Sequence, residues 1–144
     1  TGANRTINRE KLDYNETVDA LHNEETLRYH VFEGYKALLA SRGESQAFKP
    51  ASPQKVLEAP PAIFALLRGP IINENGEEER VLAVHNVSDD LAELVLSLET
   101  LGVGEHPVFE ELISGDRVAG NRDSRERLSL ELEAYEVLWL RYLA

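Results

Sequence analysis

Apolar residues in the first third of the chain recur with the spacing of an α-helix. Between residues 24 and 42 they follow one another at three- and four-residue steps, so they line one face of a helix. This stripe consists of Leu27, Val31, Tyr35, Leu38 and Leu39. Asn23 can cap the helix, and Gly43 can end it. A shorter helix is predicted before it, from a cap at Asn15 to Leu21.

After Gly43 the pattern changes to short apolar runs separated by proline, glycine and asparagine. In the clearest run, Leu128, Leu130 and Leu132 alternate with polar residues, as in a half-buried strand. Other runs span residues 63–67, 81–87, 94–98, 108–113 and 133–143. The pattern predicts about six to eight antiparallel strands in two packed sheets. The fold class is therefore α+β, with N-terminal helices followed by an antiparallel β-sandwich, and the boundary lies between Arg42 and Pro50.

Composition narrows the classes of partner. The chain has 144 residues, enough for one domain with a core, and a formal net charge of −11, which disfavours binding to nucleic acid. Its apolar runs are too short to span a membrane, so no membrane partner is expected. The absence of cysteine excludes disulfides and thiolate metal sites, and favours a cytoplasmic location.

Residues that could carry chemistry are scattered. The four histidines lack the spacing of a metal motif, so the sequence predicts no metal site and no cofactor. His85 is interpreted as a hydrogen-bonded structural residue. No pair of carboxylates is marked as facing a sugar bond, which glycoside chemistry requires. Tyr135 and Trp139 are predicted to fill the core of the closing strand rather than to form a sugar-stacking platform.

Arg5 and Arg9 are the most informative pair, because they flank Ile7 and Asn8 in a polar, loop-like opening segment. A guanidinium can hold a carboxylate through two hydrogen bonds and fix its orientation. The spacing alone favours this interpretation no more than an ordinary surface salt bridge.

Three stretches resemble one enzyme family. The segment 2–9 resembles the Gly-x-x-Arg-x-Ile-Asn-Arg loop of sucrose phosphorylases and their relatives, including glucosylglycerate phosphorylases, in the α-amylase superfamily. The segment 81–88 is similar to a strand of the superfamily's C-terminal domain that runs into Asn-x-Ser, and the segment 130–140 to its closing strand. Ala134 stands where that closing strand commonly has proline.

The resemblance implies that residues 1–46 are the last loop and helices of a catalytic barrel and that residues 47–144 are a C-terminal sandwich domain. The family transfers a glucosyl group from sucrose or a related α-glucoside to phosphate, in two steps with retention. Its aspartate nucleophile, glutamate acid/base and second aspartate lie on earlier barrel strands, so this chain holds no catalytic residue. Of the family's functional residues Arg5 is carried over, as the support of the carboxylate that holds the donor glucose.

The implied partners are a missing N-terminal catalytic barrel and, through the parent enzyme, an α-glucoside and phosphate. Two alternatives stay open: a stand-alone carbohydrate-binding β-sandwich, and a fragment of another glucosidase or transglycosylase of the superfamily. The glucosyl acceptor is not specified by these residues. The exposed stripe of the second helix also predicts a homodimer of the isolated chain, because two copies can cover each other across a two-fold axis.

Overall fold

The structure is a computed structural model that describes residues 11–105, 107–119, 121–122 and 127–143. The chain divides into two compact units, Thr1–Ala40 and Ser41–Ala144, here called the helical unit and the sandwich unit. No helix in the described part of the chain is long and apolar enough to cross a membrane.

Both predicted helices form, with shifted ends. Helix α2 (Tyr14–His22) begins one residue before the predicted cap, because Asp13 is the true cap and accepts a hydrogen bond from the Glu16 amide at 3.0 Å. Helix α3 (Leu27–Glu44) follows Thr26, whose hydroxyl accepts from the Tyr29 amide. The predicted stop at Gly43 is wrong, since α3 continues through Glu44.

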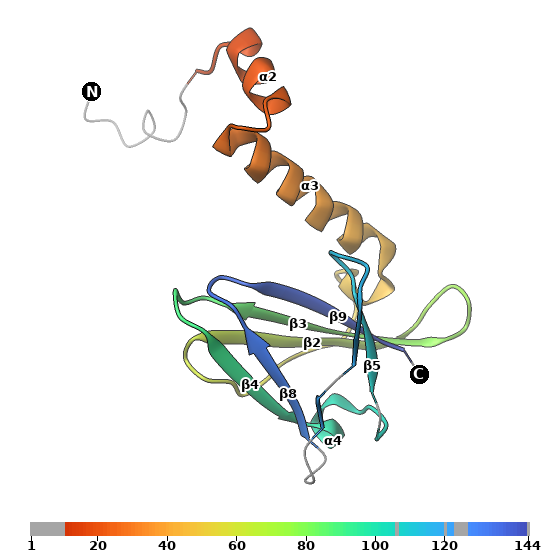
Figure 1. Cartoon of the computed structure of the whole chain (residues 1–144). Helices are drawn as coiled ribbons and strands as arrows, with labels where there is room; N and C mark the ends of the chain where they lie inside the picture. Colours follow the sequence, from red (N-terminus) through yellow and green to blue (C-terminus); the bar gives the residue numbers. More distant parts are fainter. Residues whose placement is uncertain (1–10, 106, 120, 123–126, 144) are drawn as a thin grey trace, which may run out of the picture. The chain divides into compact units, whose positions relative to one another are not determined.

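The sandwich unit contains two antiparallel sheets in the described part of the chain. Sheet A has the order β1-β2-β3-β9-β5-β6, and sheet B has the order β4-β8-β7. Figure 1 shows β2, β3 and β9 side by side in one sheet, and β4 and β8 in the other. The strands are β1 (Gln54–Val56), β2 (Ile63–Ile72), β3 (Glu78–Asn86), β4 (Ala92–Ser97), β5 (Val108–Glu111), β6 (Arg117–Ala119), β7 (Asn121–Arg122), β8 (Arg127–Leu132) and β9 (Val137–Leu143).

The core lies between the two sheets. Along β8 the residues at 128, 130 and 132 are buried, as their alternation predicts, and they face the buried residues of β4. Sheet A contributes Ile63, Ala65 and Leu67 from β2, and Leu140 from β9. The predicted α+β fold, helices followed by an antiparallel β-sandwich, is confirmed. More strands are described than were predicted, because β1, β6 and β7 are too short to leave a clear pattern in the sequence.

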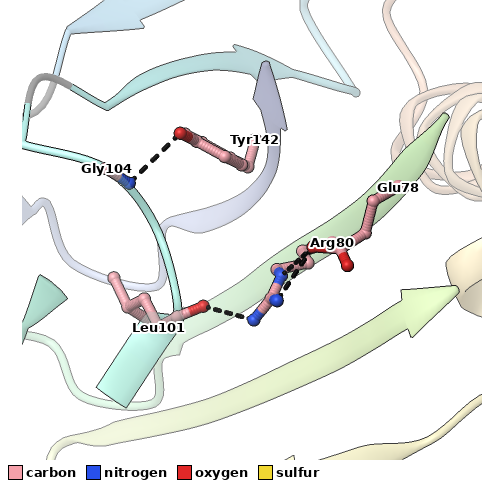
Figure 2. A network of polar contacts seen from close by, with 5 residues as sticks. All are labelled: Glu78, Arg80, Leu101, Gly104 and Tyr142. Carbon is pink, nitrogen blue, oxygen red and sulfur yellow. Dashed lines mark hydrogen bonds and ion pairs between the residues drawn. The ribbon is translucent and has the colours of Figure 1, made fainter. Parts of the chain in front are cut away.

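A short helix, α4 (Leu98–Leu101), links β4 to the loop before β5. The Arg80 guanidinium donates to the Glu78 carboxylate and to the Leu101 carbonyl at the end of α4, as Figure 2 shows. Gly102 has a positive φ of 65°, and a Cβ there would lie 2.0 Å from the Arg80 guanidinium. Glycine is therefore required for Arg80 to tie α4 to β3.

Candidate functional site

The sequence-predicted site residue, Arg5, lies outside the described residues, as does its neighbour Arg9. The substrate-binding role of Arg5 therefore stays a prediction. Within the described ranges, no group of three or more His, Asp or Glu side chains is arranged to hold a metal ion.

A polar groove of about 370 Å³ lies beside the turn that joins β2 to β3. It is lined by Asn73, Asn75, Glu77, Glu78, Glu79, Arg141, Tyr142 and Leu143. Its glutamates do not form a catalytic pair facing one bond. Glu78 and Glu79 are consecutive in a strand, so their side chains point to opposite faces. Glu77 accepts from the Asn73 amide, Glu78 from Arg80, and Glu79 from the Ser45 hydroxyl.

Two carboxylates of sheet A are buried. One accepts a hydrogen bond from a residue that precedes the sheet, and the other accepts from backbone amides. Glu79 is 4% exposed and holds Ser45, which lies just before the 3-10 helix η1 (Gln46–Phe48). Glu111 is 5% exposed and accepts from the backbone amides of Ile113, Ser114 and Trp139. Such contacts offset the cost of burying a charge and fix the segments that donate them.

Four ring side chains gather on the face of sheet A that points away from the core. Trp139 packs against Phe48 of η1, with ring centroids 4.7 Å apart and planes tilted by 50°. The Trp139 indole N–H donates to Nε2 of His85 at 3.4 Å, and the Phe64 ring meets His85 edge-on. Burial lowers the pKa of His85 below its ordinary value of about 6.5. We call these four residues the outer aromatic cluster.

The structure corrects two of the sequence predictions for these ring side chains and confirms a third. The prediction that Tyr135 fills the core is wrong, because Tyr135 is 67% exposed in the turn before β9 and has a positive φ. Trp139 does lie in β9 and is half-buried, but on the outer face of the sheet rather than in the core. His85 has the hydrogen-bonded structural role that was predicted for it.

Asn86, at the end of β3, explains the Asn-x-Ser segment. Its side chain is buried, and its amide group donates to the carbonyls of Asp90, Leu132 and Glu133. Its oxygen accepts from the amide and hydroxyl of Ser88. The motif therefore closes the end of the sandwich.

The helical unit carries an apolar groove of about 470 Å³ between α2 and α3. Its lining is mostly apolar and consists of Leu12, Thr17, Leu21, Leu27, Arg28, Val31, Phe32 and Tyr35. Leu27 is 78% exposed and Tyr35 is 65% exposed. The stripe predicted from the sequence is helical, and the rest of the described helical unit does not cover it.

One known protein is similar over almost the whole chain. The chain is 45% identical, over 142 residues, to a glucosylglycerate phosphorylase from Spirochaeta thermophila. The match covers 97% of this chain but only 23% of that enzyme, so the chain spans about a quarter of its relative. No protein-family model matches the chain.

Solved structures share the fold at low sequence identity. An Anoxybacillus α-amylase aligns with a TM-score of 0.61 and 14% identity, covering 83% of this chain and 24% of that enzyme. A maltogenic α-amylase, AmyB from Thermotoga neapolitana, aligns with a TM-score of 0.60 and 14% identity, covering 86% of this chain and 27% of that enzyme. The resemblance to glucosylglycerate phosphorylases found in the sequence is thus confirmed over about a quarter of such an enzyme, and the solved α-amylases share the fold of the chain.

Proposed function

We propose that this chain is the carboxyl-terminal, non-catalytic portion of a retaining α-glucoside phosphorylase. In this proposal residues 1–46 are the last loop and helices of the catalytic barrel, and residues 47–144 form the sandwich domain. The observation that carries it is the 45% identity over nearly the whole chain to a much longer phosphorylase. The parent enzyme would transfer a glucosyl group from glucosylglycerate, sucrose or a related α-glucoside to phosphate, in the cytoplasm.

The described geometry agrees with a non-catalytic role. Retaining glycoside chemistry uses two carboxylates about 5–5.5 Å apart on either side of the sugar bond. The glutamates of the polar groove are instead engaged by Asn73, Arg80 and Ser45. The nucleophile and the acid/base are assigned to the portion of the parent enzyme that this chain does not match.

A stand-alone carbohydrate-binding sandwich is the rival function. Sugar platforms expose the flat face of an aromatic ring to the ligand. Trp139 is half-buried, and Phe48 packs against it at a 50° tilt. Tyr135 is exposed, but it lies in a turn outside the outer aromatic cluster. The geometry therefore favours the phosphorylase portion over the platform.

A domain exchange tests the proposal. The matched 142 residues of the Spirochaeta thermophila enzyme would be replaced by this chain. We expect the chimera to release glucose 1-phosphate from glucosylglycerate, and we expect the isolated chain to release none. A chimera without activity, beside an active wild-type enzyme, would overturn the proposal.

The same chimera tests Arg5. Losing a charged contact that orients the sugar-binding carboxylate should lower kcat by about a hundredfold, since about 2.7 kcal/mol of transition-state stabilisation would be lost. The thermal midpoint of the Arg5→Ala chimera should stay near that of the parent chimera. Unchanged turnover would show that Arg5 is an ordinary surface arginine.

A further inference from the structure

One turn of the sandwich unit carries chemistry that the proposed function does not use. Strands β2 and β3 are joined by residues 73–77 (Figure 1), and in this turn Asn75 is followed directly by Gly76. It is the one asparagine of the chain that precedes a glycine. An asparagine side chain loses its amide group when the backbone nitrogen of the next residue attacks it. Glycine hinders that attack least, because it has no Cβ.

The structure leaves Asn75 and Gly76 accessible. Both residues are exposed, and Asn75 lines the polar groove beside the turn. In the described part of the chain the Asn75 side chain makes no hydrogen bond. A Cβ at Gly76 would meet no atom within 4 Å. Water therefore reaches the amide group, and the side chain has room to fold back onto the next backbone nitrogen.

Two other asparagines of the sandwich unit have their side chains held. Oδ1 of Asn73 accepts from the backbone amides of Asn75 and Glu77, and its amide group donates to the Glu77 carboxylate. Asn86 is buried, and its amide group donates to three backbone carbonyls. Neither residue is followed by glycine. Asn75 thus differs from both in its side-chain contacts and in the residue that follows it.

We propose that Asn75 is a site of spontaneous deamidation. The backbone nitrogen of Gly76 gives up its proton to water and forms a bond to Cγ of Asn75, and the side-chain amide takes up a proton and leaves as ammonia. Water then opens the succinimide ring that has formed. Opening at one carbonyl gives aspartate, and opening at the other gives isoaspartate, in which the main chain runs through the former side chain. The net change is the gain of water and the loss of ammonia, without oxidation or reduction.

The turn itself controls the rate of this reaction. The Gly76 amide donates to the Asn73 carbonyl at 3.1 Å, so this hydrogen bond has to open before the nitrogen can attack. The Asn73 side chain holds the same turn through the amides of Asn75 and Glu77, at 3.0 and 2.9 Å. Asn73 is therefore a positioning residue that slows the modification of Asn75.

The product changes the end of the hairpin. Exposed glutamates stand at positions 74, 77 and 78, so a carboxylate at position 75 adds a like charge to an acidic surface. Isoaspartate also lengthens the main chain by one carbon atom, close to the pair Ile72 and Glu78. The register of a hairpin depends on the length of its turn. The change therefore acts on the pairing of β2 with β3 beside the turn.

Peptide mass spectrometry of the isolated chain tests the proposal. The chain is kept in mildly alkaline buffer, which favours the deprotonated nitrogen, and is then digested with trypsin. Arg68 and Arg80 bound a peptide of residues 69–80. We expect Asn75 in this peptide to become aspartate and isoaspartate at least about tenfold faster than any other asparagine is modified. Asn75→Gln should abolish this conversion, since its longer side chain needs a larger ring. An unmodified Asn75 would overturn the proposal, as would aspartate without isoaspartate, because only the ring gives both products.

Asn73→Ala tests the control by the turn. It removes the acceptor of two backbone amides, so we expect conversion at Asn75 to become at least about fivefold faster than in the parent chain. The matched control is Gln46→Ala, which removes a contact with the Glu74 side chain and leaves both amides paired. It should convert at the parent rate. Equal rates in Asn73→Ala and the parent chain would overturn the role of Asn73. A rise of the same size in Gln46→Ala, or at the other asparagines of Asn73→Ala, would overturn it as well.

Discussion

The helical unit and the sandwich unit present apolar side chains in opposite ways. In the described part of the sandwich unit they form one core of fifteen buried residues between two sheets. In the described part of the helical unit no residue is buried, and Leu27, Val31, Tyr35 and Leu39 are all more than half exposed. The difference teaches that the sandwich contains its own source of stability, whereas the helices have an apolar face that needs a partner.

The largest expected effect comes from removing a ring in each unit. Phe109 is 1% exposed in the sandwich core, and Phe32 is 46% exposed on α3. Phe109→Ala should lower the free energy of unfolding by about 3–5 kcal/mol, because it removes buried apolar area and leaves a cavity. Phe32→Ala should change it by no more than about 0.5 kcal/mol.

Urea unfolding of both variants, followed through the fluorescence of Trp139, measures this difference. Trp139 lies in the sandwich unit, so the signal reports the unit in which Phe109 is buried. If Phe32→Ala were as costly as Phe109→Ala, the helices would share the cooperative unit of the sandwich, and the contrast between the units would be wrong.

The sandwich was predictable from the sequence because its strands carry local signals. The alternation of Leu128, Leu130 and Leu132 indicates a strand whichever partner it has, and it is confirmed. The outer aromatic cluster was not predictable in the same way. Phe48 and Trp139 lie ninety-one positions apart in the sequence, and no periodic pattern links them. The sequence also does not distinguish an apolar residue on the outer face of a strand from one in the core, because the core face is defined only by the position of the second sheet.

Short-range errors have simpler causes. Asp13 and Asn15 are both good capping residues, and only the backbone geometry shows that Asp13 accepts the Glu16 amide. Asn86 donates to three carbonyl groups inside the sandwich end, and only the folded structure shows these partners. The role of Arg5 stays a prediction, because that residue lies outside the described ones and its assignment rests on the resemblance of the segment 2–9.

The second effect is on association rather than on unfolding. We expect the isolated chain to pair through the stripe of α3, because each uncovered apolar area costs about 25 cal/mol per Å² in water. The double variant Leu27→Glu, Val31→Glu should weaken pairing by at least about tenfold, which corresponds to about 1.4 kcal/mol. Its unfolding free energy should stay near that of the parent chain.

Sedimentation velocity over a range of concentrations measures this pairing. The matched control is Val87→Glu, Leu91→Glu, at two positions of the sandwich unit that are each 61% exposed. The control should pair like the parent chain. A parent chain that stays monomeric at every concentration would remove the helical dimer, as would a control that dissociates as readily as the α3 variant.

The smallest expected effect is a pH dependence of the unfolding free energy that comes from His85. This residue lies on the outer face of sheet A, where the sandwich unit, like the helical unit, has partly exposed apolar side chains. Burial lowers the pKa of His85 in the folded state, so the unfolded chain takes up this proton first as the pH falls. The contribution of His85 to stability is therefore complete above about pH 6.5 and is lost as the pH falls from there through the lower folded pKa.

His85→Gln keeps a hydrogen-bond acceptor for the Trp139 indole and removes the titration. The loss of unfolding free energy between about pH 8 and about pH 5 should be smaller in this variant than in the parent chain. Equal losses in the two proteins would show that protonation of His85 does not affect the unfolding free energy.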